Sequence, residues 1–312
     1  MNKRKFKKAY SLLELSIVIL IISILITGAL SVSVGSINNA KIKTTNDRQR
    51  EVYKAIGNFL ITNKRLPCPA SLLKVKTVDA DYGNAVVGAN CSDAGVIQSG
   101  SSTNLVYGMV PSRTLGLSND MAEDAFETKM VYIVDKNFTI ASAVDPNFGV
   151  TTFSTTASTG IITVNEKPSG VTQAVTADAI VILISHGANK ASGYNSNAST
   201  QNTRATDTDE RDNDANEPTT FFNNTIFASS SNSDVFDDIV FFKRRNDFVE
   251  DFKAMFLIPC NGATASGSVT TSASAYYGQI VTRSTVACGV GLSQSRKCEA
   301  YGSWLNITTG CV

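Results

Sequence analysis

The chain has 312 residues and a formal net charge of +1, and this length allows one sizeable core and an appended module. Five of its 28 basic side chains lie within residues 1–9, so the remainder carries 23 basic and 27 acidic side chains. A mildly acidic chain disfavours nucleic acid as the main partner, without excluding it. The compact basic run at residues 243–245 is better explained as the solvated end of a strand.

A short motif follows the basic leader. Residues 9–14 read Ala-Tyr-Ser-Leu-Leu-Glu, and no charged side chain lies between Glu14 and Lys41. A carboxylate in an apolar membrane helix costs about 2.5–3.5 kcal/mol on insertion scales, so Glu14 is expected to have a specific role. The motif resembles the processing site of type IV prepilins and type II secretion pseudopilins, with Ala9 and Tyr10 in place of the usual Gly and Phe.

This resemblance implies cleavage between Ala9 and Tyr10 by a prepilin peptidase, and methylation of the new N-terminus. It implies that Glu14 pairs with the Tyr10 amine of a neighbouring subunit and sets the register of assembly. The implied function is that of a minor pilin or pseudopilin in a type IV pilus or type II secretion-like filament. Its partners would be other pilin subunits and the inner-membrane assembly platform. The alternative is a signal-anchored exported adhesion protein with a disulfide-rich recognition module.

The apolar residues 12–34 predict a single membrane-spanning helix, because about 20 such residues cross a hydrocarbon core of roughly 30 Å. The basic leader places the N-terminus in the cytoplasm. The predicted location is therefore the bacterial inner membrane, with a periplasmic head that later joins a filament or the cell surface. A plain signal anchor and a secreted protein with a cleavage site near Ala29 remain alternatives.

The helix is predicted to continue to residue 64. Apolar residues at helical spacing form a stripe that can lie on a sheet, namely Val52, Ile56, Phe59 and Leu60. Pro67 and Pro69 end the helix. The predicted domains are a leader at 1–9, the N-terminal helix at 10–64, a globular head at 65–255 and a cysteine-rich module at 256–312.

Five segments of the head are rich in Val, Ile, Phe or Tyr and bounded by turn residues, which predicts strands at 129–135, 138–144, 160–165, 178–185 and 237–243. A long helix followed by such strands indicates an α+β fold. The expected architecture is a membrane-spanning helix packed on an antiparallel sheet, as in pilins, with a small disulfide-stapled β module at the C-terminus.

A polar tract at residues 187–233 is the candidate for a metal site. It holds Asp207, Asp209, Asp212 and Asp214, whose alternating spacing could offer oxygen ligands to Ca²⁺. The EF-hand pattern fails, because Glu217 stands where that loop has glycine. A solvated acidic loop is the alternative, and no other cofactor is expected.

The six cysteines predict disulfides in an oxidising compartment, since none forms a CxxC motif. Cys68 and Cys91 are the only two in the head, so they are predicted to pair. The order of the other four, around Trp304, resembles a sushi (complement control) module. That resemblance implies the crossed pairs Cys260–Cys298 and Cys288–Cys311, with the nested pattern left as the alternative, and a recognition role for the module.

No pattern in the chain predicts an enzyme. His186 is the single histidine, and Ser185 beside it in sequence points away from it, so the pair does not predict a hydrolase. No GxSxG, Walker or GxGxxG motif occurs. His186 is better explained as a residue in the turn that follows a strand.

Overall fold

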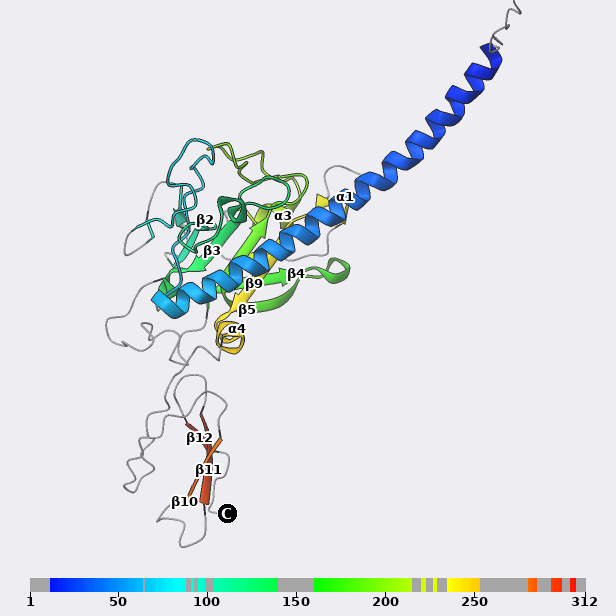
Figure 1. Ribbon diagram of the computed structural model, residues 1–312. Helices are drawn as coiled ribbons and strands as arrows, with labels where there is room; N and C mark the ends of the chain where they lie inside the picture. Colours follow the sequence, from blue (N-terminus) through cyan, green and yellow to red (C-terminus); the bar gives the residue numbers. More distant parts are fainter. Residues whose placement is uncertain are drawn as a thin grey trace, which may run out of the picture.

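The long helix α1, Leu12–Asn63, dominates the computed structural model (Figure 1). At about 1.5 Å per residue, its 52 residues extend over about 78 Å. The structure describes residues 12–63, 65–87, 91–92, 95–98, 104–139, 160–214, 220–222, 227–228, 235–252, 280–284, 293–298 and 304–306.

The C-terminal half of α1 packs on a sheet. Val52, Ile56 and Leu60 of the predicted stripe are fully buried, while Phe59 is half-buried at its margin. Gln49 is buried with them, and its side-chain amide donates to the backbone oxygens of Leu183 and Ile239 at 3.3 and 2.9 Å. The helix is therefore held on the sheet by apolar contacts and by hydrogen bonds to two neighbouring strands.

The main sheet has seven strands in the order β1-β2-β3-β5-β4-β6, and β9 also pairs with β5. Strands β2 and β3 are buried along their whole length, and so are the last seven residues of β5, as expected for strands covered on both faces. The strands are β1 Ile97–Gln98, β2 Leu105–Met109, β3 Val131–Asp135, β4 Ile162–Glu166, β5 Gln173–Ser185, β6 Thr220–Phe222 and β9 Ile239–Arg244.

The other elements are short. Two helices flank the sheet, α3 (Thr208–Asp212) and α4 (Arg245–Asp251). Strands β7 (Phe227–Ala228) and β8 (Val235–Phe236) pair with each other. A separate antiparallel sheet contains β10 (Ile280–Ser284), β11 (Ser293–Cys298) and β12 (Trp304–Asn306).

Parts of the predicted fold need correction. Four of the five predicted strands overlap with β3, β4, β5 and β9, but Phe138 closes a 3-10 helix and residues 140–144 lie outside the described residues. The sheet is mixed, because β4 and β6 run parallel. Strand β2 is not among the predicted strands, and its five residues include Gly108.

The predicted membrane-spanning segment is also wrong. Among the residues that the structure describes, no helix has both the length and the apolar character needed to span a bilayer. The predicted single-pass location in the inner membrane is overturned with it.

The segment that follows α1 is fixed to the sheet by covalent and polar contacts. Cys68 and Cys91 form a disulfide with their Cα atoms 5.4 Å apart, and this is the pair that the sequence predicts. Both cysteines are buried in the core, and Ala70 exchanges backbone hydrogen bonds with Met109 of β2 at 2.7 and 2.8 Å. Loop 65–87 therefore forms part of the core.

Lys129 is fully buried, which is rare for a lysine. Its Nζ donates to the backbone oxygens of Leu72 and Ala198 at 2.6 and 2.7 Å, and it lies 6.0 Å from the ring centroids of Tyr82 and Tyr194. Burial lowers its pKa to about 8, although the carboxylates of Glu123 and Asp79 oppose that shift. One side chain thus joins loop 65–87 to loop 187–207.

Asp135 ends β3 and is a candidate for pH-dependent stability. Its Oδ1 accepts a hydrogen bond from the Asn137 amide at 3.0 Å, but its Oδ2 is buried without a hydrogen-bond partner among the described residues. Burial raises the pKa of this carboxyl to about 6. The folded protein therefore holds a proton that the unfolded chain releases, so stability falls as pH rises from about 4 to 6.

We expect Asp135→Asn to remove this pH dependence. Between pH 4 and pH 7.5, the wild-type free energy of unfolding should fall by roughly 3 kcal/mol more than that of the variant, because a shift of one pKa unit corresponds to about 1.4 kcal/mol. Urea unfolding of both proteins at the two pH values measures the difference. Asp47→Asn is the matched control, since the Asp47 side chain is 56% exposed. Equal falls in Asp135→Asn and the wild type would contradict the prediction.

Candidate functional site

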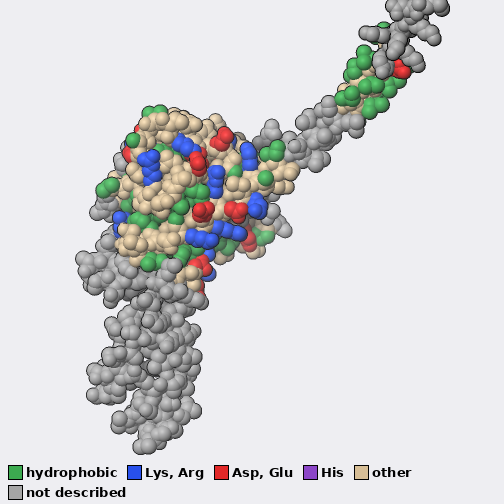
Figure 2. All heavy atoms as spheres, viewed as in Figure 1, with side chains coloured by type: hydrophobic (Ala, Val, Ile, Leu, Met, Phe, Trp, Pro, Cys, Tyr) green, Lys and Arg blue, Asp and Glu red, His purple; other side chains and the backbone are tan. Residues whose placement is uncertain are grey.

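The first described turns of α1 form an exposed apolar surface. We name residues 12–24 the apolar arm. Its large apolar side chains are between 48% and 87% exposed, and the arm extends beyond the head (Figures 1 and 2). These side chains are Leu12, Leu13, Leu15, Ile17, Val18, Ile19, Leu20, Ile21, Ile22 and Ile24.

The apolar arm is hydrophobic on every side of the helix. Residues 17–22 are six consecutive Ile, Val or Leu residues, and six residues exceed one full turn of about 3.6 residues. A helix that is hydrophobic all round is normally buried. Burying one such side chain contributes about 1.5–3 kcal/mol, so the arm has a strong tendency to associate. A single partner helix could cover only one side of it.

Glu14 lies in the first turn of α1, within the apolar arm, and its side chain is exposed. A carboxylate near a helix N-terminus interacts favourably with the helix dipole. Ala9 and Tyr10, the predicted processing site, lie outside the described residues. The structure therefore describes Glu14, but it does not describe Tyr10, whose amine is the predicted partner of the Glu14 carboxylate.

Polar contacts fix α1 to the head near the point where the helix leaves it. The Arg48 guanidinium donates to the backbone oxygens of Glu123 and Asp124, both at 2.9 Å. The Thr45 hydroxyl accepts a hydrogen bond from the Ala125 amide at 3.1 Å. These contacts precede the buried stripe, so the arm and the head are connected by one helix that is held where it leaves the head.

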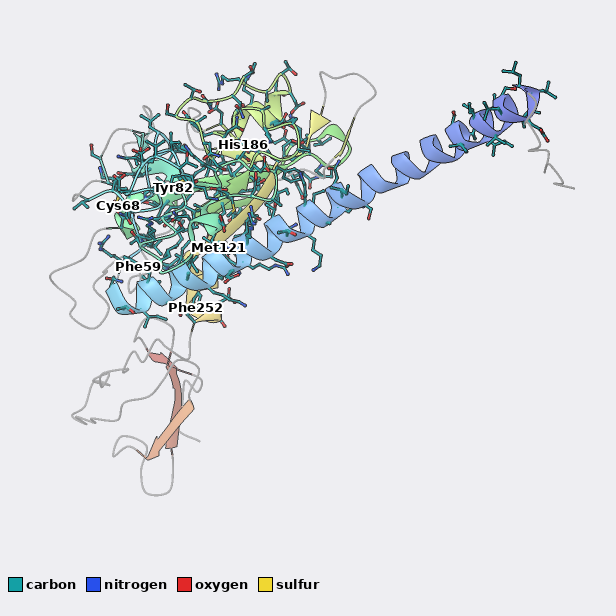
Figure 3. The ribbon with its side chains drawn as sticks, turned by 45° about the horizontal axis from the view of Figure 1, so that its top comes forward. Phe59, Cys68, Tyr82, Met121, His186 and Phe252 are labelled. Atoms are coloured by element: carbon teal, nitrogen blue, oxygen red, sulfur yellow. A yellow bond between two sulfur atoms is a disulfide. The ribbon has the colours of Figure 1, made fainter. Side chains whose placement is uncertain are left out.

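Aromatic packing fixes the other end of α1. Gly57 lets the helix approach Phe252, because a Cβ at this position would lie only 2.0 Å from the Phe252 ring (Figure 3). The Tyr53 hydroxyl donates to Asp251 at 2.7 Å, and Lys243 pairs with the same carboxylate at 2.7 Å. Burial would raise the pKa of Asp251, but the Lys243 and Tyr53 contacts outweigh it and lower that pKa.

The acidic residues predicted to bind calcium have other roles. Asp207 caps α3, and its Oδ1 accepts from the amides of Asp209 and Glu210 at 2.9 and 3.0 Å. Asp209 pairs with Lys167. Asp214 accepts from Gln201 at 2.8 Å and from Arg204 at 2.6 Å. Asp212 ends α3. In the described part of the chain, these four carboxylates do not form a metal-binding group.

A different set of carboxylates converges at the end of the central strands. Glu210, Asp237 and Asp238 each offer an oxygen, and these oxygens lie within 4.8 Å of one another. We name these three residues the carboxylate cluster. His186 lies beside it, with Nδ1 3.4 Å from Asp238 Oδ1. His186 and Asp238 are each 1% exposed, so the cluster reaches into the interior.

Strand register explains this convergence. Strands β5 and β9 are antiparallel, with Ser185 opposite Ile239. Continuing the register by one residue places His186 opposite Asp238. Helix α3 then supplies Glu210, whose Oε1 accepts from the Asn189 side chain at 2.7 Å. The sequence alone does not predict the cluster, because its members are distant in sequence and only strand pairing brings them together.

The cluster and its surroundings have perturbed pKa values. Burial and the carboxylates of Asp238 and Asp237 raise the pKa of Glu210 to about 9. Burial also raises the pKa of Asp238, against the opposing effects of His186 and Asn213. For His186, burial favours the neutral form, but attraction to Asp238 is stronger and raises the pKa.

His186 and Ser185 make different contacts. Ser185 Oγ donates to Asp124 Oδ2 at 2.6 Å, whereas His186 faces Asp238. Asp124 also accepts from the amides of Phe126 and Thr128, both at 2.9 Å. These contacts hold loop 123–129 on the end of β5.

The other four cysteines belong to the predicted disulfides Cys260–Cys298 and Cys288–Cys311. Cys260, Cys288 and Cys311 lie outside the described residues, and only the backbone of Cys298, the last residue of β11, is described.

Comparison with protein-family models, with curated proteins and with solved structures finds no significant match to the chain.

Proposed function

We propose that this chain is a structural subunit, a minor pilin or pseudopilin, of a type IV pilus or a type II secretion-like filament, and that it assembles through its N-terminal helix. The observation that carries the proposal is the apolar arm, which exposes large apolar side chains on all sides of α1. Its occupant in the filament is the same helix of neighbouring subunits. The N-terminal motif at residues 9–14 supports the same function.

The all-round apolar surface favours a helical bundle over a simple dimer. A helix with one apolar stripe is satisfied by one partner, whereas the apolar arm needs partners on several sides. Contact with several neighbours is the geometry at the centre of a filament. The head packs on the C-terminal half of α1, so it would lie outside such a bundle and carry any contact with other molecules.

Glu14 would supply register within this bundle. In apolar surroundings its carboxylate needs a cation, and the amine that cleavage exposes at Tyr10 is a suitable one. Pairing between subunits would fix their axial offset. This role rests on the resemblance and on the position of Glu14 in the first turn of α1.

A charge placed in the apolar arm should prevent assembly. We expect Ile17→Asp to reduce the amount of this chain in sheared filaments at least tenfold, because a loss of about 1.4 kcal/mol already changes an equilibrium tenfold and burying an unpaired carboxylate costs more.

Glu14→Ala should also reduce incorporation while leaving cleavage intact. Quantitative immunoblots of filament and whole-cell fractions measure both effects, and mass spectrometry of the filaments should find methylated Tyr10 as the first residue.

Val78→Asp is the matched control, because Val78 is apolar and 78% exposed but lies on the head. It should enter filaments at the wild-type level. Wild-type incorporation of Ile17→Asp would show that the arm is not the assembly surface. Normal incorporation of Glu14→Ala alone would remove only the registering role.

A further inference from the structure

The carboxylate cluster lacks the donors that three neighbouring acids need. Asp237 Oδ1 and Asp238 Oδ1 are buried without hydrogen-bond partners among the described residues. Neither ring nitrogen of His186 has a hydrogen-bond partner there, although this side chain is 99% buried and Nδ1 points at Asp238 Oδ1. Buried polar atoms in folded proteins are normally satisfied, so these orphaned atoms indicate an additional ligand.

We propose that Glu210, Asp237 and Asp238 bind a divalent cation of the oxygen-preferring class, with Ca²⁺ the best fit. Three carboxylates match the hard oxygen ligands of Ca²⁺, which also accepts irregular geometry. Mg²⁺ requires a near-ideal octahedron and gives up its water less readily. His186, whose Nδ1 faces Asp238 Oδ1, acts as a positioning residue.

The surrounding contacts hold the carboxylates in place. The Asn213 side chain donates to Asp238 Oδ2 at 2.9 Å, and the Asn189 amide donates to Asp237 Oδ2 at 2.8 Å. Asp237 therefore has one oxygen held by a donor and the other left for a ligand, whereas the second oxygen of Asp238 also faces His186 Nδ1 at 3.4 Å. Support of this kind orients ligands in protein metal sites.

Gly187 makes the close approach possible. Its φ of +57° lies in the left-handed region, and a Cβ there would lie 2.3 Å from the Asp237 backbone oxygen and 2.5 Å from Asp237 Oδ1. The turn after β5 can therefore pass directly beside the cluster.

One side of the cluster lies near solvent. Asp237 is half-buried, and Asn189, which donates to both Asp237 and Glu210, lines a polar surface pocket of about 670 Å³. A cation could enter beside Asn189. The cation would join α3 to the ends of β5 and β9, so it would stabilise the loop that follows β5 as well as the sheet.

Calcium titration of the purified full-length chain tests the proposal. At a Ca²⁺ concentration about 100 times the Kd, the thermal unfolding midpoint should rise by roughly 5–10 °C relative to the protein in chelator. Titration calorimetry should give a stoichiometry of one Ca²⁺ per chain. Asp237→Asn and Glu210→Gln, which keep side-chain shape, should each weaken Ca²⁺ binding at least tenfold.

Asp207→Asn is the matched control, because an asparagine oxygen can still cap α3, and its Ca²⁺ affinity should equal that of the wild type. Circular dichroism and melting in chelator check that each variant folds. Absence of binding at about 10 mM Ca²⁺, above the Kd range of weak extracellular calcium modules, would overturn the proposal. Wild-type affinity in both cluster variants would do the same, as would binding of Zn²⁺ without Ca²⁺.

Discussion

A chain in which alanine replaces both Cys68 and Cys91 is expected to lose roughly 3 kcal/mol of its free energy of unfolding. The disulfide joins residues separated by 23 positions, and closing a loop of this length restricts the unfolded chain by about that amount. Both cysteines are also buried, so the substitutions remove core contacts. Urea unfolding of the variant and the wild type under oxidising conditions measures the difference.

Reductant provides the control for the disulfide. Reduction should destabilise the wild-type head by a similar amount and leave the head of the double variant unchanged, because no other cysteine lies in it. Hydrogen exchange within residues 65–87 separates this effect from any change in the C-terminal module. If the double variant and the wild type unfold at the same urea concentration, the disulfide does not limit the stability of the head.

Lys129→Met should destabilise the head by at least about 2 kcal/mol at pH 7. The variant leaves the backbone oxygens of Leu72 and Ala198 without their buried donor, and each unsatisfied group costs about 1–3 kcal/mol. The hydrophobic methionine recovers part of this cost. Chemical denaturation measures the change, and Lys43→Met, at a side chain that is 82% exposed, is the control.

The difference between the wild type and Lys129→Met should grow at alkaline pH. The pKa of Lys129 is about 8 in the folded protein and 10.5 ordinarily, so the unfolded chain binds more protons between these values. Wild-type stability, relative to the variant, should therefore rise by roughly 3 kcal/mol from pH 8 to pH 10.5. A constant difference over this range would show that Lys129 has an ordinary pKa.

Sequence patterns predicted those elements whose signals are local. The helix could be followed to Pro67 because apolar spacing and proline are both local signals, and β5 could be recognised from its continuous run of Val, Ile and Leu. Strand β2 could not, because its five residues, which include Gly108, resemble a loop segment. The parallel pairing of β4 with β6 depends on chain topology, which short patterns do not contain.

The candidate sites divide in the same way. The apolar arm is one continuous segment, so its apolar composition is visible in the sequence. Composition does not identify the partner that covers the arm. The carboxylate cluster joins α3 to the start of β9, and its members become neighbours only through the pairing of β5 with β9. The alternating aspartates of the 207–214 segment were the local signal for calcium, and in the structure three of them are engaged in capping or in ion pairs.

The attachment of α1 across the sheet also has a mechanical consequence. Gln49, Val52, Ile56 and Leu60 contact the head along the helix, and the arm continues the same helix beyond it (Figure 1). Tension applied along the arm therefore acts on these contacts in shear, so that they must yield together and cannot be peeled apart one by one. Pulling on the arm should unfold the head at a higher force than pulling perpendicular to the helix.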